Sequence, residues 1–124
     1  MLGSAHVAAF VATTDPAAAR SFYGDVLGLT LVDDSPFAVV FDANGTPVRV
    51  TVVPESVIAP YTVLGWAVGD IAATIDGLVA KGVGFERYDG MGQDERGIWA
   101  SPGGALIAWF KDPEGNVLSL TQLP

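Results

Sequence analysis

The sequence contains no cysteine and only one histidine, His6. The absence of cysteine excludes disulfide bonds, thiolate metal sites and a cysteine nucleophile, and it is compatible with the reducing cytoplasm in which we expect the protein to reside. Basic residues are also few, with 6 Lys and Arg side chains against 14 Asp and Glu and a formal net charge of −8. Because nucleic-acid binding requires clustered Lys and Arg, we expect no nucleic-acid partner.

Long apolar runs are missing as well, and no basic residue precedes the first apolar stretch. We therefore predict neither a membrane span nor a signal peptide. Hydrophobic residues nevertheless make up 50% of the 124 residues, which is typical of a folded domain with a core. The excess of acidic residues favours either a cationic ligand or, more simply, a well-solvated surface.

The sequence does contain one pattern twice, about 55 positions apart. In each half an apolar run leads to an aspartate that can cap a helix, Asp15 or Asp70, and the helix then stops at Gly28 or Gly82. Each half continues with β-rich segments broken by turns. Strands are predicted at residues 6–12, 29–32, 37–41 and 47–53 in the first half, and at 62–68, 84–88, 97–100, 105–110 and 117–121 in the second.

Local signals complete this β-α-β-β-β pattern. The apolar stripe of the first helix is predicted at Ala18, Phe22 and Val26, and that of the second at Ile71, Ile75, Leu78 and Val79. Asn44-Gly45 predicts a hairpin turn, and the polar segment 89–96 is either a surface loop or a flap over a site. We predict one domain, 1–124, with modules at 1–53 and 61–124 joined by a linker at 54–60 that contains Pro54 and Pro60.

Two motifs resemble those of a known family. The segment from Asp15 through Phe22-Tyr23 to Leu27-Gly28 is similar to the "D…FY…vLG" signature of the vicinal oxygen chelate superfamily, and Phe110 to Asn116 resembles its closing "f.DPdGN" turn. This superfamily includes glyoxalase I, extradiol dioxygenases, and the fosfomycin- and bleomycin-resistance proteins. The resemblance implies an α+β fold in which two βαβββ modules form a U-shaped mixed sheet around a cleft, with the helices on the convex face. It also suggests a homodimer.

Metal-dependent members of this family place a histidine on the first strand and a carboxylate on the last strand of each module. When these positions are carried over to this sequence, they fall on Ala8, Arg49, Val63 and Ser119, with Thr51 replacing Arg49 if the register slips. Ala and Val cannot ligate a metal, Ser is a poor ligand, and Arg repels a cation. His6 shares the strand face of Ala8 and would supply one ligand at most, so we predict no metal and no cofactor.

Side chains at the lost-ligand positions, and others on the same strand face, are candidates to bind a small molecule. They are Phe10, Arg49, Thr51, Ser119 and Thr121, together with Trp99 and Trp109, whose rings could stack on a flat ligand or pack in the core. Trp66 is expected to pack against a helix. Arg49, in a sheet, requires either an anionic ligand or an internal carboxylate partner.

The sequence predicts, first, a metal-free protein similar to bleomycin-resistance proteins, which sequesters a small organic molecule in the cleft between the modules. An alternative is a metal-dependent lyase or dioxygenase of the same superfamily with unrecognised ligands. A third is a cofactor-free enzyme in which Arg49 stabilises an oxyanion.

Overall fold

The computed structural model describes all residues from Met1 to Pro124. The chain divides into two compact units, Met1–Val57 and Ile58–Pro124, so the boundary falls inside the segment 54–60. We call these units module one and module two. Neither module contains a helix with the length and apolar character of a membrane span.

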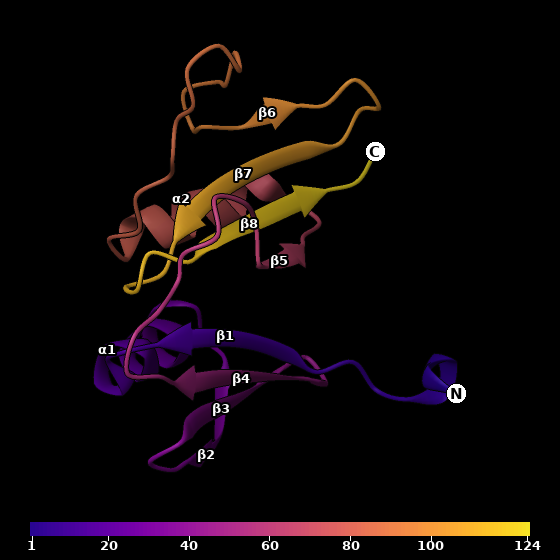
Figure 1. The fold of residues 1–124 in the computed structure, drawn as a ribbon. Coiled ribbons are helices and arrows are strands. Elements are labelled where there is room, and N and C mark those ends of the chain that lie inside the picture. Colours follow the sequence, from indigo (N-terminus) through magenta and orange to yellow (C-terminus); the bar gives the residue numbers. More distant parts are fainter. The chain divides into compact units, whose positions relative to one another are not determined.

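Module one is a four-stranded mixed sheet with one helix (Figure 1). The strand order is β1-β4-β3-β2, and β1 runs parallel to β4 while the other neighbours are antiparallel. A single 3₁₀ turn, Leu2–Ser4, precedes the sheet. The elements are β1 (Ala9–Thr13), α1 (Pro16–Arg20), β2 (Thr30–Asp34), β3 (Ala38–Ala43) and β4 (Thr46–Val52).

Module two repeats this topology and confirms the predicted pair of βαβββ units (Figure 1). Its strand order is β5-β8-β7-β6, and again the first strand runs parallel to the last. The elements are β5 (Leu64–Ala67), α2 (Ile71–Ala80), β6 (Trp99–Ala100), β7 (Leu106–Lys111) and β8 (Val117–Gln122).

The first helix starts as the sequence predicts but ends differently. Asp15 Oδ1 accepts a hydrogen bond from Ala18 N at 3.1 Å, and Pro16 follows at the first helical position. After Arg20 the helix widens into a π-helical turn, Ser21–Val26. The fully buried positions are Ala19 and Tyr23, one residue later along the chain than the predicted Ala18 and Phe22, and Val26 is only half-buried.

The second helix follows its predicted pattern more closely. Asp70 Oδ1 caps it by accepting a hydrogen bond from Ala73 N at 3.0 Å. Ile71 and Ile75 are buried against the sheet, whereas Val79, which the sequence places in the same stripe, is 52% exposed. Gly82 follows the helix with a φ of 93°, a conformation that glycine adopts without a Cβ clash.

The edge strand of module two is split, which corrects the strand predicted at 84–88. Only Phe85 pairs there, in a single antiparallel bridge with Phe110 of β7. The chain then leaves the sheet and returns at Trp99, which pairs with Ile107 near the other end of β7. The intervening residues are the polar segment that distinguishes module two from module one.

Gln93 holds the two parts of this split strand together. Its Nε2 donates to the carbonyl oxygens of Glu86, at 3.0 Å, and Gly97, at 2.8 Å, while its Oε1 accepts from Tyr88 N at 2.7 Å. One side-chain amide thus replaces hydrogen bonds that a continuous strand would make. The loop from residue 87 to 98 is therefore anchored at its base.

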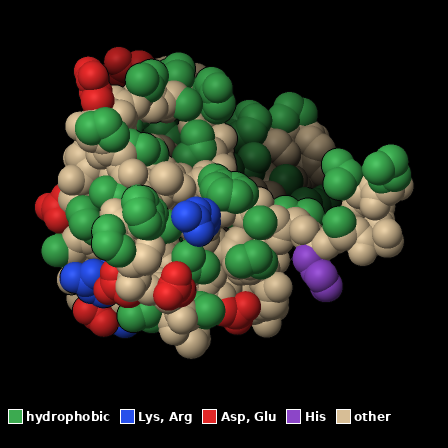
Figure 2. All heavy atoms as spheres, turned by 60° about the horizontal axis from the view of Figure 1, so that its bottom comes forward, with side chains coloured by type: hydrophobic (Ala, Val, Ile, Leu, Met, Phe, Trp, Pro, Cys, Tyr) green, Lys and Arg blue, Asp and Glu red, His purple; other side chains and the backbone are tan.

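In each module the helix packs on one sheet face, and the core lies between them. The side chains on that face include Val11, Val39, Phe41, Val48 and Val50 in module one, and Ala108, Phe110, Leu118 and Leu120 in module two, all buried. The opposite face of each sheet carries no helix of its own module; we call it the open face. Elsewhere on the surface, hydrophobic side chains lie among scattered acidic and basic ones (Figure 2).

Candidate functional site

Arg49 lies at the centre of the open face of module one. It is on the inner strand β4, opposite Phe10 of β1 and Val40 of β3. Phe10 is 62% exposed although it lies on a strand, and Arg49 is half-buried. Thr51, the next residue of β4 on this face, lies opposite Ala38. The structure thus brings together the three site residues predicted in this module: Phe10, Arg49 and Thr51.

Arg49 has no carboxylate partner. The ion pairs of the chain join Arg20 to Asp34, Arg96 to Asp76, and Lys111 to Glu86. The alternative of an internal Asp or Glu beside Arg49 is therefore not realised. A half-buried guanidinium with all its donors free is suited to binding an anion, because planar carboxylates match its geometry.

Ser119 takes the corresponding place in module two. It lies on the inner strand β8, opposite Gly65 of β5 and Trp109 of β7, and is only 7% exposed. A Cβ on Gly65 would lie 2.9 Å from Ser119 Oγ and 3.2 Å from the Ser119 carbonyl oxygen, so a larger residue here would force Ser119 to shift. Thr121, two residues further along β8, lies on the same face opposite Ile107.

The two modules share one register at these positions. Phe10 lies opposite Arg49 in module one, just as Gly65 lies opposite Ser119 in module two. Counting two residues back from Phe10 and Gly65 gives Ala8 and Val63, the first-strand positions where the resemblance expects histidine. The symmetry of the repeat therefore supports the carry-over of all four positions.

The residues at those four positions do not fit a divalent metal ion. Ala8 and Val63 have no donor atom, Arg49 is cationic, and Ser119 offers one hydroxyl. Elsewhere, no three His, Asp or Glu side chains gather closely enough to hold a metal. His6 is exposed in the segment before β1.

Three aromatic side chains gather on the open face of module two. The ring of Trp109 lies 5.6 Å from that of Tyr88, edge to face, and 6.2 Å from that of Trp99, tilted by 38°. All three are partly accessible to solvent. We call Tyr88, Trp99 and Trp109 the aromatic cluster. Ser119, directly opposite Trp109 on β8, lies next to it.

The remaining tryptophan lies on the other face of the same sheet, as the sequence predicts. Trp66 lies opposite Leu120 and stacks on Phe110 at 6.4 Å, within the layer covered by α2. Trp99 and Trp109 are candidates predicted from the sequence, whereas Tyr88 is not among them. Strand alternation from Phe85, which pairs with Phe110, would have placed Tyr88 on the open face.

Comparison with known proteins identifies the family. The sequence model of the Glyoxalase/Bleomycin resistance protein/Dioxygenase superfamily matches residues 3–120. The chain therefore belongs to this superfamily, and the resemblance of its two motifs is confirmed. No curated protein matched the chain by sequence.

Solved structures of the same superfamily share the fold. A protein assigned to the glyoxalase family from Bacillus anthracis is 17% identical, with a TM-score of 0.76 over 98% of this chain and 96% of that one. A lactoylglutathione lyase from Agrobacterium tumefaciens is 19% identical, with a TM-score of 0.74 over 96% and 93% of the two chains. A superfamily member from Sphaerobacter thermophilus is 22% identical, with a TM-score of 0.73 over 96% and 97%.

Proposed function

We propose that this protein binds a small organic molecule with a planar ring system, without a metal ion, and sequesters it in the manner predicted from the resemblance to bleomycin-resistance proteins. The aromatic cluster of module two is the observation that best supports this function. Trp99 and Trp109 offer ring faces and edges on a sheet surface that α2 does not cover. Indole rings in such a setting stack favourably on flat ligands.

The polar groups beside the cluster are suited to orient such a ligand. Ser119 lies opposite Trp109 across the β7–β8 ladder, and Thr121 follows on the same face. Pockets for small molecules are typically apolar, with a few hydroxyls or charges that fix orientation. Ser119 and Thr121 therefore serve as orienting groups in this proposal, and the aromatic rings supply most of the contact area.

Tryptophan fluorescence tests the proposal, because the chain provides its own control. The ligands are planar aromatic compounds of positive, negative and zero charge. They are titrated against the wild type and the variants Trp99→Phe, Trp109→Phe and Trp66→Phe. Calorimetry measures the affinities in parallel. We expect Trp66→Phe to bind like the wild type and the two cluster variants to lose affinity by about tenfold, given the energy of one aromatic contact. Unchanged affinity in both cluster variants would refute the proposed surface.

The metal-free part of the proposal requires its own measurement. Native mass spectrometry of protein purified without chelators, before and after addition of Zn²⁺, Ni²⁺ or Fe²⁺, reports the metal content and the oligomeric mass together. We expect a metal-free homodimer. One tightly bound divalent ion per chain would instead support the alternative of a metal-dependent lyase or dioxygenase, which hemithioacetal isomerisation and ring-cleavage assays would then distinguish.

Arg49 supports a second candidate function, a cofactor-free enzyme in which its guanidinium stabilises a developing oxyanion. The observation behind it is the absence of any carboxylate partner at a half-buried position. Candidate organic substrates are incubated with the protein and screened for products by mass spectrometry. Arg49→Met should abolish any product formation, whereas Arg20→Met, which removes the same charge from an exposed ion pair, should not. Turnover that survives Arg49→Met would exclude this candidate.

A further inference from the structure

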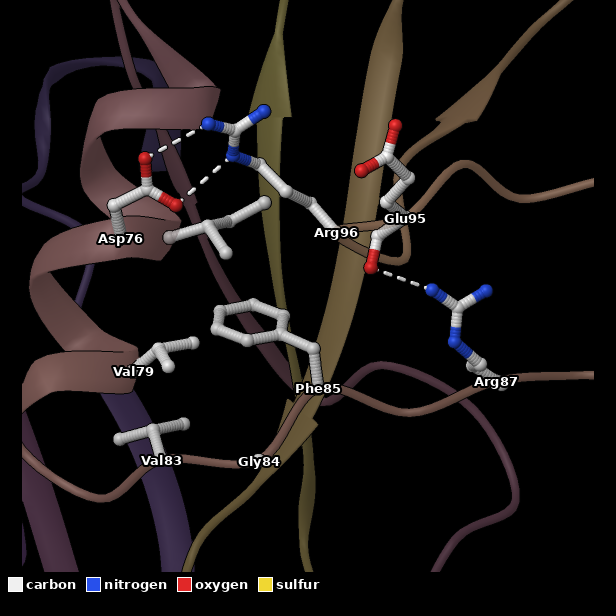
Figure 3. A pocket seen from close by; sticks show the side chains of 9 residues that line it. Asp76, Val79, Val83, Gly84, Phe85, Arg87, Glu95 and Arg96 are labelled. Atoms are coloured by element: carbon white, nitrogen blue, oxygen red, sulfur yellow. Dashed lines mark hydrogen bonds and ion pairs between the residues drawn. The ribbon is translucent and has the colours of Figure 1, made fainter.

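Module two also contains a pocket on the helix-covered side of its sheet. A cavity of about 360 Å³ lies between α2 and the chain segments 83–87 and 95–96 (Figure 3). Phe85, which lines it, pairs with Phe110, and their rings are 5.3 Å apart. Because Phe110 is in the layer beneath α2, this pocket is on the opposite side of the sheet from the aromatic cluster.

The inner wall of the pocket is apolar. Ile75 and Val83 line it and are buried. The ring of Phe85 projects toward Val79 of α2 (Figure 3). Val79, one helical turn beyond Ile75, is 52% exposed on the same wall. The volume is within the range of small-molecule sites, and apolar walls of this kind gain free energy when a ligand displaces water.

Two arginines with different surroundings line the rim. Arg96 donates from Nε and Nη2 to the two carboxylate oxygens of Asp76, both at 2.9 Å, so its charge is compensated. Arg87 is held instead by main-chain oxygens. Its Nη2 donates to the carbonyls of Asp94, at 2.7 Å, and Glu95, at 2.6 Å.

The charge of Arg87 is therefore fixed in position but not paired. The side chain of Glu95 points away from the Arg87 guanidinium, and no ion pair joins them (Figure 3). The Nε and Nη1 donors of Arg87 make no hydrogen bond within the chain. A guanidinium held by two carbonyls has already lost much of its side-chain freedom, which lowers the entropic penalty of binding an anion.

From this combination of apolar walls and one unpaired, positioned guanidinium, we propose that the pocket binds a small monocarboxylate with an apolar body. The body lies against Val79, Val83 and Phe85, and the carboxylate accepts hydrogen bonds from Arg87. This site is separate from the aromatic cluster, so either proposal stands if the other fails.

The test uses phenylacetate and its neutral isostere phenylacetamide as probes of the whole 124-residue chain. We expect ¹⁵N-resolved NMR titration with phenylacetate to shift the amides of residues 75–87 and 94–96 saturably. Phenylacetamide should bind at least about tenfold more weakly, because it lacks the charge-assisted hydrogen bonds to the guanidinium. Equal binding of the two probes, shifts that centre on Trp109 and Ser119, or the absence of saturable shifts would overturn the proposal.

Variants separate the roles of charge and cavity. Arg87→Met should weaken phenylacetate at least about tenfold and leave phenylacetamide unchanged, whereas Arg20→Met, with the same loss of charge, should change neither. Val79→Trp should block both probes by filling the pocket, and Val57→Trp, at a fully exposed position of the linker, should block neither. If Val79→Trp does not fold, the Arg87 comparison alone decides, and undiminished phenylacetate binding by Arg87→Met refutes the site.

Discussion

Asp76 and Arg96 connect the long loop of module two to its helix through two hydrogen bonds of 2.9 Å. Asp76 is on α2, and Arg96 is 20 residues later, just before the chain returns to the sheet at β6. Both side chains are about half exposed. This planar, bidentate pair joins the helix surface to the loop, whose other side-chain hydrogen bonds come from Gln93, Arg87 and Asp94.

The first prediction concerns the pH dependence of this link. The hydrogen bonds from Arg96, assisted by its charge, hold the pKa of Asp76 below its ordinary value of 3.8. A carboxylate with a lowered pKa in the folded state stabilises the fold above its ordinary pKa, and this contribution is lost as the pH falls through the lower folded value. Asp76→Asn should therefore be less stable than the wild type at neutral pH, and the difference should disappear in strong acid.

Urea denaturation over a descending pH series measures this difference. Asp89→Asn is the matched control. Asp89 lies in the same loop as Arg96, and its substitution removes one negative charge without removing a hydrogen bond to Arg96. A stability difference between Asp76→Asn and the wild type that persists unchanged below pH 3.8 would contradict the assignment.

The second prediction concerns the close approach of β5 and β8. Gly65→Ala should destabilise module two by about 1–3 kcal/mol, the usual range for inserting a methyl group into a packed position. Its Cβ would meet Ser119 Oγ at 2.9 Å and the Ser119 carbonyl oxygen at 3.2 Å. Adding Ser119→Ala should restore part of the loss, because it removes the nearer atom.

Gly84→Ala provides the comparison in denaturant melts, since a Cβ there meets no atom within 4 Å and the backbone is not in the left-handed region. Equal effects of Gly65→Ala and Gly84→Ala would show that the β5–β8 contact does not restrict residue 65.

The third prediction concerns Gln93 and the split strand. Gln93→Glu keeps an oxygen to accept from Tyr88 N but replaces the amide that donates to Glu86 and Gly97. We expect a loss of about 1–3 kcal/mol in local stability, the usual range for leaving polar groups unsatisfied. Hydrogen exchange of residues 86–98 should accelerate while α2 and β8 stay protected. Exchange that is unchanged in the loop would mean that other contacts hold it.

The fourth prediction separates a structural from a functional role for Arg49. Because its half-buried charge has no partner within the chain, Arg49→Met should leave the free energy of unfolding unchanged or raise it by about 1 kcal/mol. The methionine stem fills similar space between Phe10 and Val40. A loss of stability well beyond this range in chemical denaturation would show that the guanidinium has a structural role.

The repeat could be predicted from the sequence because its signals are local. Asp15 and Asp70 cap helices through their own next turn, and Asn44-Gly45 forms a two-residue hairpin in which both φ angles are positive, as the sequence predicts. Arg49 and Ser119, which the resemblance to the family singled out, both lie on open faces. Helix caps, the hairpin turn and the family's motifs are all short stretches of sequence, so they were sufficient to predict these features.

Features that depend on contacts distant in the sequence could not be predicted. The stripe of the first helix is one such feature, because Tyr23, rather than Phe22, packs against Phe41 of β3, with ring centres 6.0 Å apart. The split of the predicted strand at 84–88 is bridged by the side chain of Gln93. A single glutamine in a polar segment gives no sequence signal for such a role. The sequence also could not show that Arg87 has no ion-pair partner, because that depends on where every carboxylate lies in the fold.

The outer strand of module one has a consequence for handling the protein. All five residues of β2 are exposed, and they include Leu31 and Val32 on an edge with unpaired main-chain groups. Such an edge can recruit foreign strands and start aggregation, but a register shift between Leu31 and Asp33 and the charge of Asp33 oppose this, while the charge of Asp34 is compensated by Arg20. High salt concentrations, which screen the charge of Asp33, are therefore the conditions in which concentrated protein should be hardest to keep in solution.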